Sequence, residues 1–272
     1  MKKQLFLIST IFFGLMGFMI TGCQKTAIDT SDPWNINSPE KSAVIGNETF
    51  DGLNSLTDAV FNSNNLKSLK LGECPVITLN ISQLPYTLTF DWGTGCTGAD
   101  GIARSGKISI SLTGKMGTVG SVATFTFTDF YSDGNKISGV HTITYAGPNP
   151  GNGWPRFEVH TEAQITFPDN KSMTYNSDNI RLFAAGYDTP LNFSDDVWRI
   201  EGTASGTTRN GVNWTAKCNH ALVKKVACQW FDSGTIVVTP DGGLASTIDF
   251  GDGTCDNKAT LTIGDKTINV EM

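Results

Sequence analysis

Hydrophobic and polar residues alternate with a period of two along most of the chain after residue 66. The clearest run lies between Phe157 and Phe167, where every second residue is apolar or a threonine. Such alternation is typical of strands with one buried and one exposed face. Turn sequences such as Asp133-Gly134-Asn135 separate the runs, which favours hairpins between neighbouring strands. We therefore predict a single all-β domain over 66–272, an antiparallel meander closed as a barrel or stacked as a sandwich.

One short helix is predicted before the strands. Four apolar residues recur at spacings of three and four, namely Phe50, Leu53, Leu56 and Val60. This spacing places them on one helical face, so we predict a short helix within 49–65. The preceding residues are mostly Asp, Ser, Thr, Asn and Pro and show no apolar period, so 23–48 is interpreted as a lipidated N-terminus followed by a flexible tether.

The first residues have the composition of a secretory signal. Two lysines precede an apolar run that ends at Ile20, which is short for a membrane span and is soon followed by polar residues. The run leads into Ile20-Thr21-Gly22-Cys23, which resembles the lipobox of bacterial lipoproteins. The resemblance implies that residues 1–22 are removed as a signal peptide and that Cys23 carries the lipid. We expect the acyl chains to anchor the mature chain to a membrane.

The charge balance excludes one class of partner. Removing residues 1–22 takes two of the 20 basic residues and none of the 26 acidic ones, so the mature chain has a formal charge of 18 − 26 = −8. Nucleic-acid binding depends on a basic face that neutralises phosphates. We therefore expect no nucleic-acid partner.

Five cysteines remain after Cys23, and four of them lie in two similar segments. Each segment begins with a cysteine and ends in an aromatic, glycine-rich turn with a second cysteine: Cys74 with Asp91-Trp-Gly-Thr-Gly-Cys96, and Cys228 with Asp249-Phe-Gly-Asp-Gly-Thr-Cys255. Because exported chains meet an oxidising compartment, we predict the disulfides Cys74–Cys96 and Cys228–Cys255. Cys218 is left without a role, and Cys218–Cys228 is the competing pair. A metal site made of these cysteines is disfavoured because they lack paired Cys-x-x-Cys spacing.

The most motif-like acidic segment is Asp249-Phe-Gly-Asp252-Gly-Thr-Cys-Asp256. Its three carboxylates alternate with glycines, and oxygen-rich loops of this kind can hold Ca²⁺. The spacing differs from the twelve-residue helix–loop–helix pattern, and no glutamate closes the loop. A turn tied by a disulfide is therefore the alternative interpretation, and no other cofactor is expected.

A ligand-binding candidate is Trp154, which ends the glycine- and proline-rich segment that begins at Gly147. An exposed indole can stack on a sugar, and loops on rigid β scaffolds often carry binding residues. The alternative is that Trp154 folds back onto the core. No Gly-x-Ser-x-Gly elbow occurs, and the histidines His141, His160 and His220 are interpreted as structural or solvated. No catalytic residue is therefore predicted.

The lipobox, the polar tether and the two cysteine-containing segments together resemble the lipoproteins of unassigned activity that are common in the Bacteroidota. The resemblance implies an outer-membrane location, with the side of the membrane left open. We expect a non-catalytic binding or structural β domain at the cell envelope, with a glycan or an envelope protein as its partner. The alternative function is a hydrolase acting on glycans, whose chemistry needs two carboxyl groups across a sugar.

Overall fold

The computed structural model describes residues 32–61, 74–98, 101–189 and 192–272, with side chains of the helix described as far as Ser55. The predicted signal segment, 1–22, and Cys23 lie outside these ranges. Within them, no helix is long and apolar enough to cross a membrane.

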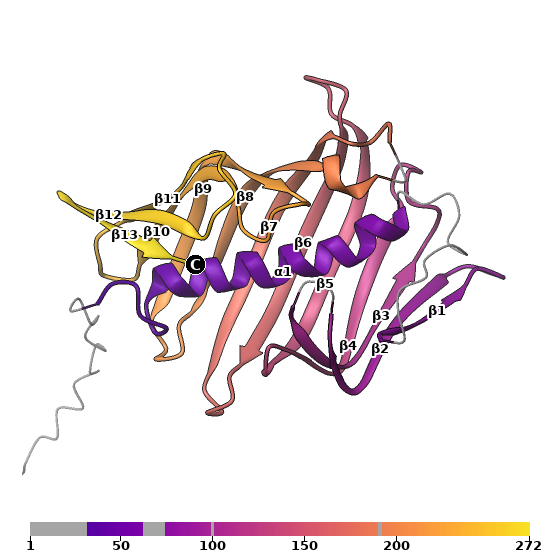
Figure 1. The fold of residues 1–272 in the computed structure, drawn as a ribbon, viewed down its shortest axis with the longest axis horizontal. Helices are drawn as coiled ribbons and strands as arrows, with labels where there is room; N and C mark the ends of the chain where they lie inside the picture. The colour runs from indigo at the N-terminus through magenta and orange to yellow at the C-terminus, as the bar shows by residue number, and fades with distance from the viewer. Residues whose placement is uncertain (1–31, 62–73, 99–100, 190–191) are drawn as a thin grey trace, which may run out of the picture.

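A single antiparallel sheet contains the thirteen strands of the described chain, and strands adjacent in sequence are adjacent in the sheet. The strands are β1 (Val76–Asn80), β2 (Tyr86–Thr97), β3 (Ala103–Leu112), β4 (Val122–Ser132), β5 (Asn135–Pro148), β6 (Pro155–Thr166), β7 (Ser172–Ala185), β8 (Val197–Thr207), β9 (Asn213–Lys225), β10 (Ser233–Pro240), β11 (Ser246–Asp252), β12 (Lys258–Ile263) and β13 (Lys266–Glu271). A 3₁₀ turn, η2 (Phe193–Asp195), precedes β8. The predicted all-β antiparallel meander with one helix is confirmed (Figure 1).

The hairpin between β4 and β5 shows how turn chemistry sets the register. Ser132 pairs with Asn135, so only Asp133 and Gly134 form the loop. Both loop residues have positive φ, 48° and 76°. A two-residue loop of this type matches the right-handed twist of the strands, and Asp-Gly is one of its preferred sequences. The turn predicted at Asp133-Gly134-Asn135 is therefore present.

The helix, α1 (Pro39–Phe61), begins ten residues before the predicted start at residue 49. Residues 39–48 are thus helical, and the prediction that they belong to a flexible tether is wrong. The physical reason is a strong start signal: the backbone N–H of Lys41 donates to the Ser38 hydroxyl at 3.1 Å, and Pro39 occupies the first helical position. The buried face of this first part mixes the polar Glu40 and Ser42 with Ala43 and Val44, which hides the helical period from a search for apolar residues.

The helix crosses the strands on one face of the sheet, which we call the inner face (Figure 1). Near its start, the Ser246 hydroxyl at the beginning of β11 donates to Glu40 at 2.8 Å. Further along, Asn54 lies 3.0 Å from the ring of His141 on β5. The helix thus covers the sheet from β11 to β5. The apolar core lies on this face and includes Phe50 and Leu53, as the spacing predicted, while the side chains of Leu56 and Val60 lie outside the described residues.

Gly46 allows α1 to approach the sheet closely. A Cβ atom at this position would lie 2.0 Å from the ring of Tyr175 on β7, whereas a Cβ atom at Gly52 would meet nothing within 4 Å. Tyr175 is buried, and its hydroxyl donates to the Asn47 side chain at 3.0 Å. The glycine therefore fits a contact that no larger residue can make without displacing the helix or the ring.

The two predicted disulfides, Cys74–Cys96 and Cys228–Cys255, are present, with Cα atoms 6.4 and 5.7 Å apart. Cys218 is a free, half-buried thiol on β9. Burial raises the pKa of this thiol, which keeps it in the unreactive protonated form. Nothing in the structure assigns Cys218 a role beyond its position in the strand.

The similarity between the two cysteine-containing segments extends to their turns. In the first, Asp91 Oδ1 accepts the backbone N–H of Gly93 at 2.9 Å, and in the second Asp249 Oδ1 accepts that of Gly251 at 2.9 Å. The aromatic residue between each pair, Trp92 or Phe250, is buried. Each segment therefore uses the aspartate to fix a bend and the aromatic ring to attach the strand to the core.

The two helical glycines provide a matched test of how α1 packs. Gly52→Ala should raise the free energy of unfolding by up to about 1 kcal/mol, because alanine has the higher helix propensity. Gly46→Ala should lower it by about 1–3 kcal/mol, because the new methyl group overlaps the Tyr175 ring. Urea denaturation followed by circular dichroism measures both. Equal effects of the two substitutions would contradict the close approach at Gly46.

Candidate functional site

Two polar sites lie on opposite faces of the sheet. The first lies between α1 and the inner face, where an apolar core would be the usual arrangement. Eleven residues of α1 and its N-cap are buried among those whose side chains are described, and five of them are polar, namely Ser38, Glu40, Ser42, Asp51 and Asn54. Buried polar groups are tolerated when they are hydrogen-bonded, so the contacts made by Asp51 and Asn54 define this interface.

His141 links α1 to two strands. Its Nε2 lies 3.0 Å from Asn54 Oδ1 and its Nδ1 lies 2.9 Å from the Thr161 hydroxyl on β6. Removal from water lowers the pKa of His141 to about 3, and the positive charge of Arg181 contributes in the same direction. The imidazole is therefore neutral at physiological pH, and its two ring nitrogens form hydrogen bonds that connect the helix to the sheet.

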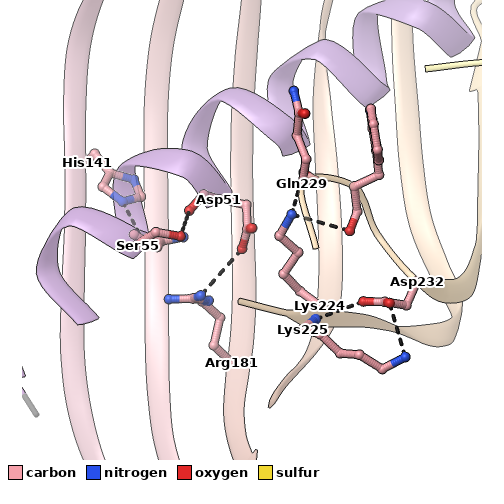
Figure 2. Close-up of polar contacts among 10 residues, drawn as sticks. Asp51, Ser55, His141, Arg181, Lys224, Lys225, Gln229 and Asp232 are labelled. Carbon is pink, nitrogen blue, oxygen red and sulfur yellow. Dashed lines mark hydrogen bonds and ion pairs between the residues drawn. The ribbon is translucent and has the colours of Figure 1, made fainter. Parts of the chain in front are cut away.

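An ion pair crosses the same interface one turn earlier along the helix. The Arg181 guanidinium on β7 lies 3.4 Å from Asp51 Oδ1, and both side chains are almost fully buried (Figure 2). The guanidinium also lies over the Trp198 ring, with 4.2 Å between its carbon and the ring centroid. Both charges are removed from solvent, and losing one partner of such a buried pair typically costs about 3–5 kcal/mol.

A cavity of about 20 Å³ lies between these contacts. Its lining is mostly polar and includes Asn47, Asp51, Asn54, Thr161, Asn179 and Arg181. A space of this size and polarity can hold about one water molecule, but no organic substrate. The inner polar site therefore positions the helix and has no room for catalysis on a substrate.

Further charged groups lie beside the helix near β9 and β10. Burial raises the pKa of Glu48, and burial also lowers the pKa of Lys224. The Lys224 ammonium donates to the backbone carbonyls of Gln229 and Trp230, and Lys225 forms a 3.2 Å ion pair with the buried Asp232 (Figure 2). These contacts tie the β9–β10 connection to the strands, which is a structural role.

The second site lies on the face of the sheet opposite α1, which we call the outer face. Here strands β6 to β10 form an open groove of about 810 Å³, which we call the outer groove. The strand register aligns its outward side chains in two rows that cross five strands. One row is His160, Asp178, Thr203, Lys217 and Val237, and the other is Glu162, Asn176, Ser205, Thr215 and Thr239.

One end of the outer groove carries a cluster of charged side chains. His160 Nδ1 lies 2.7 Å from Asp178 Oδ1, and its Nε2 lies 3.4 Å from Glu162 Oε1. The hydrogen bond to Asp178 raises the pKa of His160 above its usual range, and the charges of both carboxylates contribute in the same direction. The imidazole ring thus lies between two acidic side chains that favour its protonated form, and all three groups remain accessible to solvent.

The residues that the sequence singled out lie away from the outer groove. Trp154 is half-buried at the end of the β5–β6 loop, where Asn152 accepts its backbone N–H. Asp249, Asp252 and Asp256 each accept a backbone N–H two residues ahead, from Gly251, Thr254 and Lys258. Each carboxylate thus already stabilises its own turn.

The predicted Ca²⁺ ligands do not converge in the described part of the chain. The one group of potential metal ligands there that meets within 4.8 Å is Cys228, Asp232 and Cys255. The two sulfurs of that group form a disulfide, so they are unavailable as thiolate ligands. A shared calcium ion would require the three predicted aspartates to leave their turns.

Sequence reasoning missed the outer groove because its side chains come from five strands. His160 and Glu162 are two residues apart on β6, but Asp178 joins them only through the β6–β7 register. The sequence signal that could have indicated this site is the set of polar residues at alternate positions of β6. Its outward positions carry glutamate, histidine and glutamine in place of the commoner threonine.

Comparison with known proteins adds no family. No family model matches the chain, and no curated protein or solved structure matches it. Functional interpretation therefore depends on the residues themselves.

The buried imidazole makes stability depend on pH. Because the folded-state pKa of His141 is about 3 and the unfolded value is about 6.5, the unfolded state binds the additional proton between these values. The contribution of His141 is therefore complete above pH 6.5 and is lost as the pH falls towards 3. By pH 5 we expect a loss of about 2 kcal/mol from this group.

Denaturant unfolding of wild type and His141→Gln at pH 7 and pH 5 tests this dependence. The variant should lose less stability than wild type between the two conditions. His160→Gln is a control of opposite sign, because the raised folded-state pKa of His160 makes its contribution present at acid pH and lost as pH rises through that value. An unchanged pH response in His141→Gln would show that this imidazole does not stay neutral in the folded state.

Proposed function

We propose that the chain is a lipid-anchored lipoprotein of the bacterial outer membrane whose β domain binds a ligand without catalysis. The observation that carries the binding role is the outer groove, an accessible hollow lined by polar side chains on a face that the protein does not use for its core. Rows of residues held by paired strands are positioned more rigidly than residues on loops. A preformed surface that carries several hydrogen-bonding groups suits recognition of an extracytoplasmic ligand with matching donors and acceptors.

The proposed anchor follows from the lipobox and complements the fold. Cys23 would carry the acyl chains, and α1 begins only sixteen residues later, at Pro39. Sixteen residues of extended chain reach at most about 50–60 Å. The domain would therefore stay within that distance of the membrane surface, close to envelope glycans and envelope proteins.

Lipidation at Cys23 is tested by growing expressing cells with an alkyne-labelled fatty acid and detecting the label on the purified chain. Wild type and Cys218→Ala should be labelled, whereas Cys23→Ala should not be. The second variant controls for the loss of a cysteine, since Cys218 is a free thiol in the folded domain. Label retained on Cys23→Ala would contradict the proposed anchor.

One observation favours the alternative function, a hydrolase acting on glycans. The outer groove places a histidine between two carboxylates, and glycosidases use two carboxyl groups across the scissile bond. However, Glu162 and Asp178 side chains are 67% and 78% exposed, whereas a catalytic acid usually sits in an apolar pocket that raises its pKa.

Catalysis is tested by incubating the folded chain with a panel of oligosaccharides and measuring reducing ends. We expect no release above the buffer control, because the two carboxylates lack the environment of a catalytic pair. If products form, Glu162→Gln and Asp178→Asn decide whether the outer groove is responsible. Turnover that either variant abolishes would replace the binding role with the hydrolase.

A further inference from the structure

The ligand class follows from how the outer groove is built. Neighbouring strands lie about 4.8 Å apart, so the two rows that cross β6 to β10 extend for about 19 Å at right angles to the strands. Along each strand the rows are two residues apart, which is about 7 Å. The groove is therefore a narrow track across the sheet, suited to an elongated ligand whose successive units repeat along the rows.

The middle of the track is lined by short side chains. Thr203, Ser205 and Thr215 occupy it in the two rows. The register shift between Ile200 and Thr203 adds a local bend to β8.

The central hydroxyl groups are available to a ligand. Elsewhere on the outer face, hydroxyls on neighbouring strands bond to one another, as in the 2.9 Å contacts Thr174–Thr207 and Thr262–Thr267. In the described chain, the side chains of Thr203, Ser205 and Thr215 make no hydrogen bond to another protein group. Each of them retains both a donor and an acceptor.

Charge and polarity narrow the ligand further. Lys217 and His160 face the carboxylates of Glu162 and Asp178, so the lining has no net charge when His160 is protonated and one negative charge when it is neutral. In neither state does the lining carry an excess of positive charge. A polyanion would find at most two cations in the lining, His160 and Lys217. A peptide cannot add as a strand, because the strands beneath the groove are paired on both sides.

We infer that the outer groove binds an unbranched, neutral glycan that lies across strands β6 to β10, an inference that rests on the binding role proposed above. Sugar hydroxyls both donate and accept, as do the threonine and serine hydroxyls and the Asn176 amide along the track. The carboxylates of Glu162 and Asp178 can accept from sugar hydroxyls at one end, where His160 holds them in place. Recognition would depend mainly on hydrogen bonds, since neither row contains Trp, Tyr or Phe.

The test uses the full chain purified in a detergent that has no sugar head group. Affinity electrophoresis and calorimetry measure binding to a neutral unbranched polysaccharide, an acidic polysaccharide and an unfolded polypeptide. Wild type should bind the neutral glycan, with little change between low and high salt because the ligand is uncharged. Asn176→Ala should weaken binding by roughly fivefold, the effect of one typical hydrogen bond.

Thr203→Trp fills the middle of the track and should weaken binding by roughly tenfold or more. Thr126→Trp is the matched control, because Thr126 is an exposed outward residue of β4 outside the groove. Both positions are in strands, which accept tryptophan, and circular dichroism confirms the folded state of each variant. Equal binding by wild type and Thr203→Trp would overturn the assignment of the site.

The remaining outcomes separate this inference from the proposed function. Groove-dependent binding of only the acidic polysaccharide, lost in Lys217→Ala, or of only the polypeptide, would overturn the neutral glycan and leave the binding role intact. Failure of the folded wild type to bind any of the three would also overturn the glycan inference. Glycan cleavage lost in Asp178→Asn would instead overturn the non-catalytic function itself.

Discussion

The packing of α1 across the inner face is the contact on which the rest of the structure depends. A sheet of thirteen neighbour-paired strands has a wide apolar face, and in the described chain one helix covers its middle from β11 to β5. A helix of 23 residues is about 34 Å long, which matches the width of about seven strands. The helix therefore joins strands that are distant in sequence and would otherwise be connected only through their neighbours.

Polar anchors give this packing a fixed register. An apolar helix could slide or rotate on an apolar sheet, because hydrophobic contact is non-directional. Asn54 on His141, Asp51 on Arg181 and Asn47 on Tyr175 each have one geometry that satisfies both partners. Burying these polar groups costs free energy of desolvation. The directional hydrogen bonds and the ion pair that they form offset this cost and fix the position of the helix. The inner site is thus explained by the fold, which leaves the outer face for function.

The alternating pattern made much of this fold predictable. The alternation over residues 157–167 predicted a half-buried strand, and Asp133-Gly134 predicted a tight hairpin. The two similar cysteine-containing segments predicted both disulfides. The start of α1 was missed because Glu40 and Ser42 are polar yet buried beside Ala43 and Val44, which conceals the periodicity expected of an amphipathic helix. Ser38 followed by Pro39 was the signal that could have located it.

The outer groove was not predictable for a different reason. Period-two alternation assigns a residue to a face, but neighbours across strands depend on register, which bulges at Ile200/Thr203 and at Ser233/Thr235 alter. A one-residue change in β8 would remove Thr203 and Ser205 from the rows. Candidate residues chosen for their individual chemistry, such as Trp154, therefore did not locate the groove. The groove is instead marked by the hydroxyl groups of Thr203, Ser205 and Thr215, whose importance depends on how the strands align them.

The proposed anchor and the proposed groove support each other energetically. A track without Trp, Tyr or Phe offers several hydrogen bonds, each with a net contribution of only about 0.5–1.5 kcal/mol, so a single copy would bind a glycan weakly. Copies held on one membrane by Cys23 would face a polymer with many equivalent units, and the second contact would then be intramolecular. Effective concentrations of this kind raise avidity by roughly 10²–10⁴ without any new contact. Lipid anchoring would thus convert a weak, reversible site into stable retention of a polymer at the cell envelope.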